Sequence, residues 1–125
     1  MYSHVMLGAN DLEASKTFYD ATFGALGYAA GNADPKGRVF YTTPTGTFAI
    51  TKPLDGAPAC GANGGTVGFT AASPEHADAW HAAGLANGGT ACEDAPGVRG
   101  MGAYKLYLAY LRDPAGNKLC AMLRV

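Results

Sequence analysis

The apolar and polar positions near the start of the chain predict a strand followed by a helix. His4 to Ala9 is a short apolar-rich run, and Asn10 and Asp11 after it can each cap the start of a helix. Residues at three- and four-residue spacing then mark one face: Leu12, Ser15, Phe18, Tyr19 and Phe23. This spacing predicts an amphipathic helix with a mostly apolar face, ending at Gly24 or Gly27.

A second strand and helix follow after the middle of the chain. Thr66 to Ala71 is another short strand-like run, Ser73 can cap a helix, and Pro74 suits the first helical position. The buried face of this helix is marked by Ala77, Trp80, Gly84 and Gly88. The pair Gly88-Gly89 predicts its end.

The two strand and helix units share one register. Thr66, at the start of the second strand, lies 62 positions after His4. Trp80, the main aromatic residue of the second helix, lies 62 positions after Phe18. The equal offset predicts that the chain is an internal duplication.

Each half closes on a turn of the form x-Pro-x-Gly-x, Thr43 to Thr47 in the first half and Asp113 to Asn117 in the second. Proline fixes φ early in such a turn and glycine accepts a positive φ late in it, which reverses the chain. Strand-like runs flank the two turns: Arg38 to Thr42 with Phe48 to Thr51, and Tyr104 to Leu111 with Lys118 to Met122. The pattern therefore predicts an α+β fold in which each half ends in a hairpin.

The length of 125 residues predicts a single domain, with one module at about 1–56 and a second at about 64–125. Pro53 to Gly65 is rich in Gly, Ala and Pro and is interpreted as the linker between them. Ala91 to Gly102 shows no periodicity and is predicted to be a long loop, a lid or a binding loop.

The composition narrows the function classes. Nine basic and ten acidic residues give a net charge of −1, which argues against a nucleic-acid partner. The apolar runs are far shorter than the roughly 20 residues that cross a membrane, so no membrane association is expected. Cys60, Cys92 and Cys120 form no C-x-x-C pair and are expected to be free thiols. With no export signal at the N-terminus, the protein is expected to be cytoplasmic.

Three segments carry a resemblance to a known family. They are Ser3 to Glu13 continuing to Phe18-Tyr19, Gly65 to Phe69, and Tyr110 to Asn117, which has the form aromatic-x-x-Asp-Pro-x-Gly-Asn. In this order and spacing they resemble the vicinal oxygen chelate superfamily of glyoxalases, bleomycin resistance proteins and dioxygenases. The resemblance implies two tandem βαβββ modules that form an incomplete barrel around a cleft, with the helices outside. It also implies a homodimer, since many members are dimers.

The resemblance further implies where a divalent metal would bind. Four positions related by the duplication converge in metal-dependent members, and here they fall on His4, Thr66, a residue on or near Ile50, and Cys120. Only His4 matches the usual family ligand. We therefore expect the metal site to be degraded and the protein to need no cofactor. The alternative is that His4 and Cys120 weakly bind Zn, Ni, Mn or Fe.

The second hairpin predicts part of a pocket wall. A five-residue turn places Tyr110 opposite Cys120, and counting back by twos puts Leu108, Leu106 and Tyr104 on the same face. Such an aromatic and aliphatic wall suits a small organic ligand, although the same residues could simply pack the barrel. Arg99, near this wall, is a candidate for binding an anionic group.

Three functions remain open at this point. The first is a small-molecule-binding protein of the bleomycin-resistance type, with His4, Thr66 and the residues of the predicted wall lining its pocket. The alternative is a metal-dependent enzyme, similar to lactoylglutathione lyase or to a thiol-transfer or ring-cleaving relative, in which the metal polarises vicinal oxygens of the substrate. The third is a subunit or regulator whose pocket has become structural.

Overall fold

The computed structural model describes residues 1–125, except for the side chain of Met101. Each half of the chain begins with a strand and a helix and ends in a hairpin. The first half contains β1 (His4–Gly8), α1 (Leu12–Ala25), β2 (Asn32–Ala33), β3 (Val39–Thr43) and β4 (Gly46–Thr51). The second half contains β5 (Val67–Thr70), α2 (Pro74–Ala86), β6 (Thr90–Ala91), β7 (Gly97–Met101), β8 (Tyr104–Arg112) and β9 (Lys118–Arg124).

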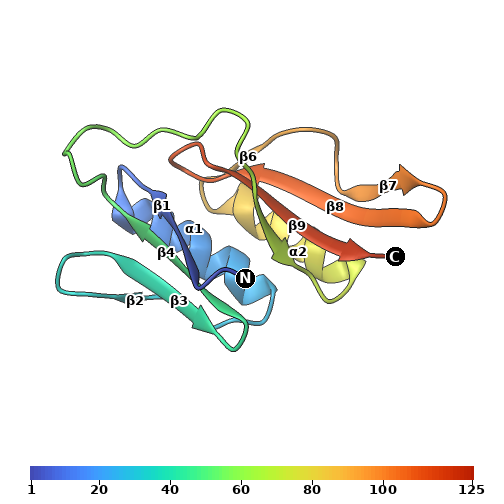
Figure 1. Cartoon of the computed structure of the whole chain (residues 1–125), viewed down its shortest axis with the longest axis horizontal. Coiled ribbons are helices and arrows are strands. Elements are labelled where there is room, and N and C mark those ends of the chain that lie inside the picture. The colour runs from blue at the N-terminus through green and yellow to red at the C-terminus, as the bar shows by residue number, and fades with distance from the viewer.

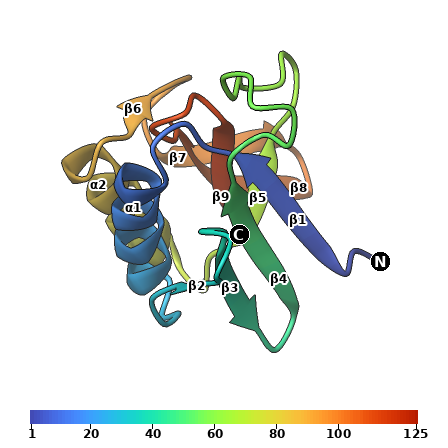
Figure 2. The ribbon, with the colours of Figure 1, turned by 90° about the vertical axis from the view of Figure 1, so that its left-hand side faces the viewer.

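The strands form two separate sheets, one from each half. The first has the order β1-β4-β3-β2, and the second has the order β5-β9-β8-β6 with β7 also paired to β8. The sheets lie side by side, and both helices cover the same side of them (Figures 1 and 2). The predicted α+β class is confirmed, with helices outside two sheets that do not close into a barrel.

The two helices begin as the sequence predicts. The Asp11 carboxylate accepts a hydrogen bond from the Ala14 backbone N–H at 3.0 Å, and the Ser73 hydroxyl accepts one from the His76 N–H at 3.2 Å. Both caps satisfy a backbone donor that has no partner within the helix. The cap residues again lie 62 positions apart, so the register predicted for the duplication is confirmed.

Aromatic side chains join the two halves in one core. The ring of Phe69, from β5, lies 4.9 Å from that of Phe23 in α1 and 5.4 Å from that of Phe48 in β4. Both pairs meet edge to face, a favourable arrangement for aromatic rings. On the helix side, Phe18 and Trp80 are fully buried. The core therefore belongs to both modules.

The turn between β8 and β9 also connects the halves. Asp113 is 3 % exposed and accepts hydrogen bonds from the Tyr19 hydroxyl at 2.5 Å and from the Asn117 backbone N–H at 2.9 Å. The Asn117 side chain donates to the Gly8 carbonyl of β1 at 2.9 Å. Burial, and then the charge of Asp113, raise the pKa of Tyr19 well above its usual value. The turn from Asp113 to Asn117 is therefore a buried polar contact between the modules.

The prediction of one long loop over 91–102 is wrong. Residues 97–101 form β7, which pairs antiparallel with β8. The pairing runs from Gly97 opposite Leu108 to Met101 opposite Tyr104. The sequence does not reveal this strand because Gly97 and Gly100 interrupt its alternation, and Gly100 has a positive φ. Only the segment before β7 remains irregular.

The described chain contains no helix that is both long enough and apolar enough to cross a membrane.

Candidate functional site

The second sheet has one face against the helices and one open face. Ala109, Leu111, Leu119 and Ala121 are fully buried on the helix side. The intervening residues lie on the open face, where Tyr110 is opposite Cys120 and Leu108 is opposite Met122. The predicted register of this hairpin is confirmed. Tyr104 lies at the start of β8, beside the turn from β7, and is 74 % exposed.

Two cations lie beside the ring of Tyr110. The Arg99 guanidinium carbon is 5.4 Å from the ring centroid, and the Lys118 amine is 5.0 Å from it. Both distances are within the range of a cation–π interaction. Lys118 also forms an ion pair with Glu93, which has a φ of 58°, uncommon for a residue other than glycine.

Arg99, predicted as a possible anion ligand, contacts mainly the backbone. Its guanidinium donates to the carbonyls of Asp94 at 2.8 Å and Ala95 at 3.0 Å, and to that of Leu108 at 3.4 Å. These bonds hold the segment before β7 against β8. Most of the donors that an anion would need are therefore already in use.

Cys120 is a poor thiolate in this position. The residue is 6 % exposed, and burial raises the pKa of its thiol. A hydrogen bond from Tyr110 acts in the opposite direction but does not cancel this effect. Because the thiolate is the form that binds metals, burial weakens Cys120 as a ligand.

The first sheet shows which residue corresponds to Cys120. On β1, Met6 lies opposite Ala49, and on β5 Gly68 lies opposite Cys120. Since Gly68 follows Met6 by 62 positions, Ala49 is the counterpart of Cys120. Ile50, predicted on or near this position, is fully buried among the core residues. Ala49 has no side-chain donor for a metal.

His4 and Thr66 complete the four positions. His4 is exposed at the start of β1, and its Nδ1 lies 2.8 Å from the Ser3 hydroxyl. Thr66 is exposed just before β5. Among the side chains that the structure describes, no three His, Cys, Asp or Glu residues are grouped so that they could hold a metal ion. The donor set His4, Ala49, Thr66 and Cys120 does not fit the metal site that the resemblance implies.

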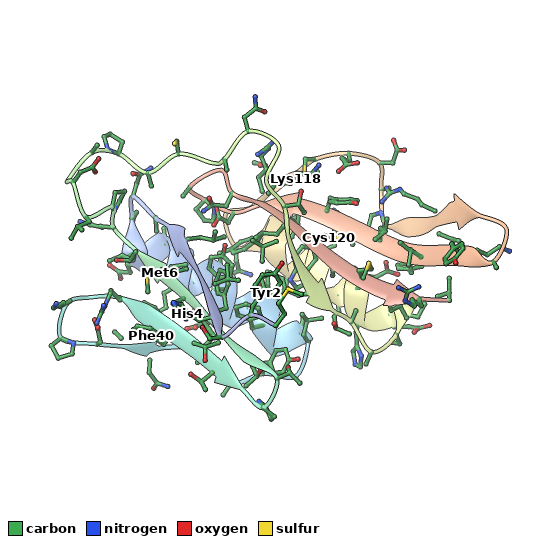
Figure 3. All side chains as sticks on the ribbon, in the orientation of Figure 1. Tyr2, His4, Met6, Phe40, Lys118 and Cys120 are labelled. Atoms are coloured by element: carbon green, nitrogen blue, oxygen red, sulfur yellow. The ribbon has the colours of Figure 1, made fainter. Side chains whose placement is uncertain are left out.

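A cleft of about 340 Å³ opens between the two sheets. We call it the seam cleft, because β1 lines one side and β5 the other. Of the predicted site residues, His4 lines this cleft, whereas Thr66, Arg99, Tyr104, Leu108, Tyr110 and Cys120 do not. Figure 3 shows His4, Met6 and Phe40 over the first sheet, and Lys118 and Cys120 over the second. The structure therefore separates His4 from the predicted wall.

The sequence did not identify most of the residues of the seam cleft. They come from the N-terminal segment, the end of α1, the β3–β4 hairpin and β5, and include Tyr2, Phe23, Tyr28, Tyr41, Phe48 and Phe69. The sequence predicted only Phe23 among them as a core residue, and all of them except Tyr2 contact the core. One end of this core is open at the junction of the modules, which no local pattern reveals.

The sequence profile of the Glyoxalase/Bleomycin resistance protein/Dioxygenase superfamily matches residues 2–121. The chain belongs to this superfamily. Among solved structures, a glyoxalase/bleomycin resistance protein from Albidiferax ferrireducens T118 is 61 % identical to this superfamily member, with a TM-score of 0.93 and 98 % of each chain covered. No curated protein matches the chain.

More distant superfamily structures share the fold. A family enzyme from Burkholderia phytofirmans PsJN is 20 % identical, with a TM-score of 0.72 over 96 % of this chain and 95 % of that one. A lactoylglutathione lyase from Agrobacterium tumefaciens is 22 % identical, with a TM-score of 0.61 over 98 % and 92 %. At such identities the likeness concerns the fold of this superfamily member and not its chemistry.

Proposed function

We propose that this superfamily member is a small-molecule-binding protein of the bleomycin-resistance type that works without a metal ion. The observation that carries the proposal is the donor set at the four duplicated positions. Ala49 provides no ligand atom, Thr66 provides only a hydroxyl, and the Cys120 thiol is buried with a raised pKa. His4 is then the one ordinary metal ligand, which is too few for a tight divalent site.

The rest of the site supports ligand binding. The seam cleft is of the size that small organic ligands occupy, and its walls are largely aromatic. Small-molecule pockets in proteins are generally apolar with a few placed polar groups, and His4 and the threonines of the rim provide such groups here.

Metal analysis tests the proposal. The protein is purified from cells supplied with Zn, Ni, Mn and Fe and analysed by mass spectrometry, beside a His4→Ala variant as the matched control. We expect far less than one metal ion per chain in both proteins, and no change in melting temperature when the metals are added. One tightly held ion per chain, lost in His4→Ala, would contradict the proposal and favour the metal-dependent enzyme.

An activity assay tests the alternative directly. The hemithioacetal of methylglyoxal and glutathione is the substrate to use, with Ni or Zn added. We expect no turnover above the reaction without protein. Turnover that depends on the added metal would make the protein an enzyme similar to lactoylglutathione lyase.

We further propose that the protein is a cytoplasmic homodimer. Apolar side chains on the open faces and edges of the sheets remain exposed: Met6, Val98, Tyr104 and Met122. A second copy would bury them, since such exposed apolar residues often mark protein interfaces. The three cysteines are free thiols, as expected in a reducing compartment.

A further inference from the structure

We infer that the seam cleft selects uncharged, planar aromatic or conjugated molecules. This inference rests on the proposed binding function and adds the class of ligand. It concerns the cleft between β1 and β5 and not the open face around Tyr110 and Cys120, where the sequence predicted one wall of the pocket. The evidence is the charge, shape and hydrogen bonding of the cleft's lining residues.

The lining of the seam cleft contains no Asp, Glu, Lys or Arg side chain. The one imidazole in the lining belongs to His4. The one formally charged group in the lining is the terminal amine of Met1, a residue that is fully exposed to solvent. A charged ligand group buried against the other lining residues would lose its hydration without gaining a counter-ion, which is costly. The cationic side chains Arg99 and Lys118 lie instead beside Tyr110 on the open face of the second sheet. The cleft therefore disfavours charged ligands.

The aromatic residues of the cleft hold one another in place. The ring of Phe23 lies 4.8 Å from that of Tyr41, 4.9 Å from that of Phe69 and 6.2 Å from that of Tyr28. Phe48 contacts both Phe23 and Phe69. Phe23, Tyr41 and Phe48 are nearly buried and form the support, whereas Tyr28 and Phe69 are partly exposed. Rings fixed in this way provide a preformed surface on which a planar molecule packs with little loss of side-chain entropy.

The hydroxyl of Tyr41 is not available to a ligand. It donates to the Asp20 carboxylate at 2.8 Å, and burial together with this bond raises the pKa of Tyr41. Asp20 in turn accepts from Lys16 at 2.6 Å and from the Gly31 backbone N–H at 2.9 Å. Tyr41 is only 3 % exposed, and its polar end is satisfied within the protein.

Neutral hydroxyl groups also line the cleft. They belong to Ser3, Thr43, Thr45, Thr47 and Thr70. Such groups can donate or accept a hydrogen bond but carry no charge, so they suit a phenol, a quinone or an amide on the ligand. The cavity of about 340 Å³ is at the lower end of the range for ligand pockets and favours a molecule of one to three rings.

Two fluorescent probes with the same rings test the inference. 2-Naphthol is neutral at pH 7, whereas 2-naphthoate carries a negative charge. We expect 2-naphthol to bind at least about tenfold more tightly. In NMR titrations of the full chain we expect it to shift the backbone amides of Val5, Thr47 and Thr70, and not those of Leu108 and Tyr110.

Gly68 provides a variant that adds a side chain to the lining of the cleft. It lines the cleft on β5, and a Cβ added there would have no heavy atom within 4 Å. Gly68→Val therefore adds volume to open space in a strand, where valine is favoured. We expect it to weaken 2-naphthol binding at least about tenfold. Thr70→Ile, at the exposed rim of the same strand, is a second variant with the same expected loss.

Gly97→Val is the matched control. Gly97 pairs with Leu108 on the second sheet, and an added Cβ would come no closer than 3.8 Å to other atoms. We expect this variant to bind 2-naphthol like the original protein. Failure of 2-naphthol to bind, 2-naphthoate binding as tightly, or loss of binding in Gly97→Val alone would each overturn the inference. None of these results depends on a metal ion. The metal analysis therefore tests the proposed function separately from this inference about the ligand.

Discussion

At the scale of single residues, the buried polar side chains of the β8–β9 turn stabilise the fold through hydrogen bonds. Asp113 and Asn117 belong to the segment that resembles the superfamily, and both are buried. Asp113 is bonded to Tyr19, and Asn117 is bonded to Gly8, so each residue of the turn reaches the first module. Removing one partner of a buried hydrogen bond lowers the free energy of unfolding, because the other partner then has neither a hydrogen bond nor access to water. These residues therefore act on stability and not on the ligand.

Tyr19→Phe tests this role. The substitution removes the hydroxyl that donates to the buried Asp113 carboxylate and leaves the aromatic ring in place. We expect the free energy of unfolding to fall by about 1–3 kcal/mol, measured by urea denaturation. Tyr104→Phe, at a position that is 74 % exposed, is the matched control and should leave stability unchanged. Equal stability of Tyr19→Phe and the original protein would show that this hydrogen bond makes no net contribution to the free energy of unfolding.

At the scale of elements, the close approach of α1 and α2 depends on one glycine. A Cβ on Gly84 in α2 would lie 2.2 Å from Leu111 Cδ1 and 3.1 Å from Phe18 Cε2. Both neighbours are fully buried, so neither can move away without disturbing the core. Gly84 is therefore kept for packing, although glycine lowers the intrinsic stability of a helix.

Two glycine substitutions separate packing from helix propensity. Gly84→Ala gains propensity but overlaps its neighbours, and we expect it to lower the free energy of unfolding by about 1–3 kcal/mol. Gly24→Ala in α1 makes the same chemical change where no atom lies within 4 Å of the new Cβ. We expect it to raise stability by up to about 1 kcal/mol. The inference about close packing fails if both variants change stability in the same direction.

At the scale of the whole molecule, the two modules share too much structure to be independent. Phe69 of the second module packs on Phe23 and Phe48 of the first, and the β8–β9 turn is bonded to β1. Separating the modules would expose these rings and leave buried polar groups without partners. We propose that residues 1–125 unfold as a single domain.

Urea unfolding followed by two signals tests this cooperativity. Fluorescence of Trp80, the single tryptophan, reports on the second module, and far-UV circular dichroism reports on both modules. We expect the two transitions to coincide, as in a two-state process. Phe69→Ala should lower both midpoints together. We expect the free energy of unfolding to fall by about 2–4 kcal/mol, less than for a fully buried phenylalanine, because the ring of Phe69 is only partly buried. Separate transitions would mean that the modules fold independently.

The sequence alone determined the features that depend on neighbours along the chain. The helix caps Asp11 and Ser73, the 62-residue offset and the pairing of Tyr110 with Cys120 are set by local periodicity and turn chemistry. These rules act over a few residues, so they can be read without knowing the rest of the fold.

Only the tertiary structure decided where a ligand could bind. The seam cleft joins residues as distant as His4, Phe23 and Phe69, and its existence depends on two sheets that meet without pairing. The same packing put Ala49, and not Ile50, opposite Met6, and left the guanidinium of Arg99 bonded to backbone carbonyls. Such outcomes depend on how whole elements pack, because side chains far apart in the sequence then share one surface.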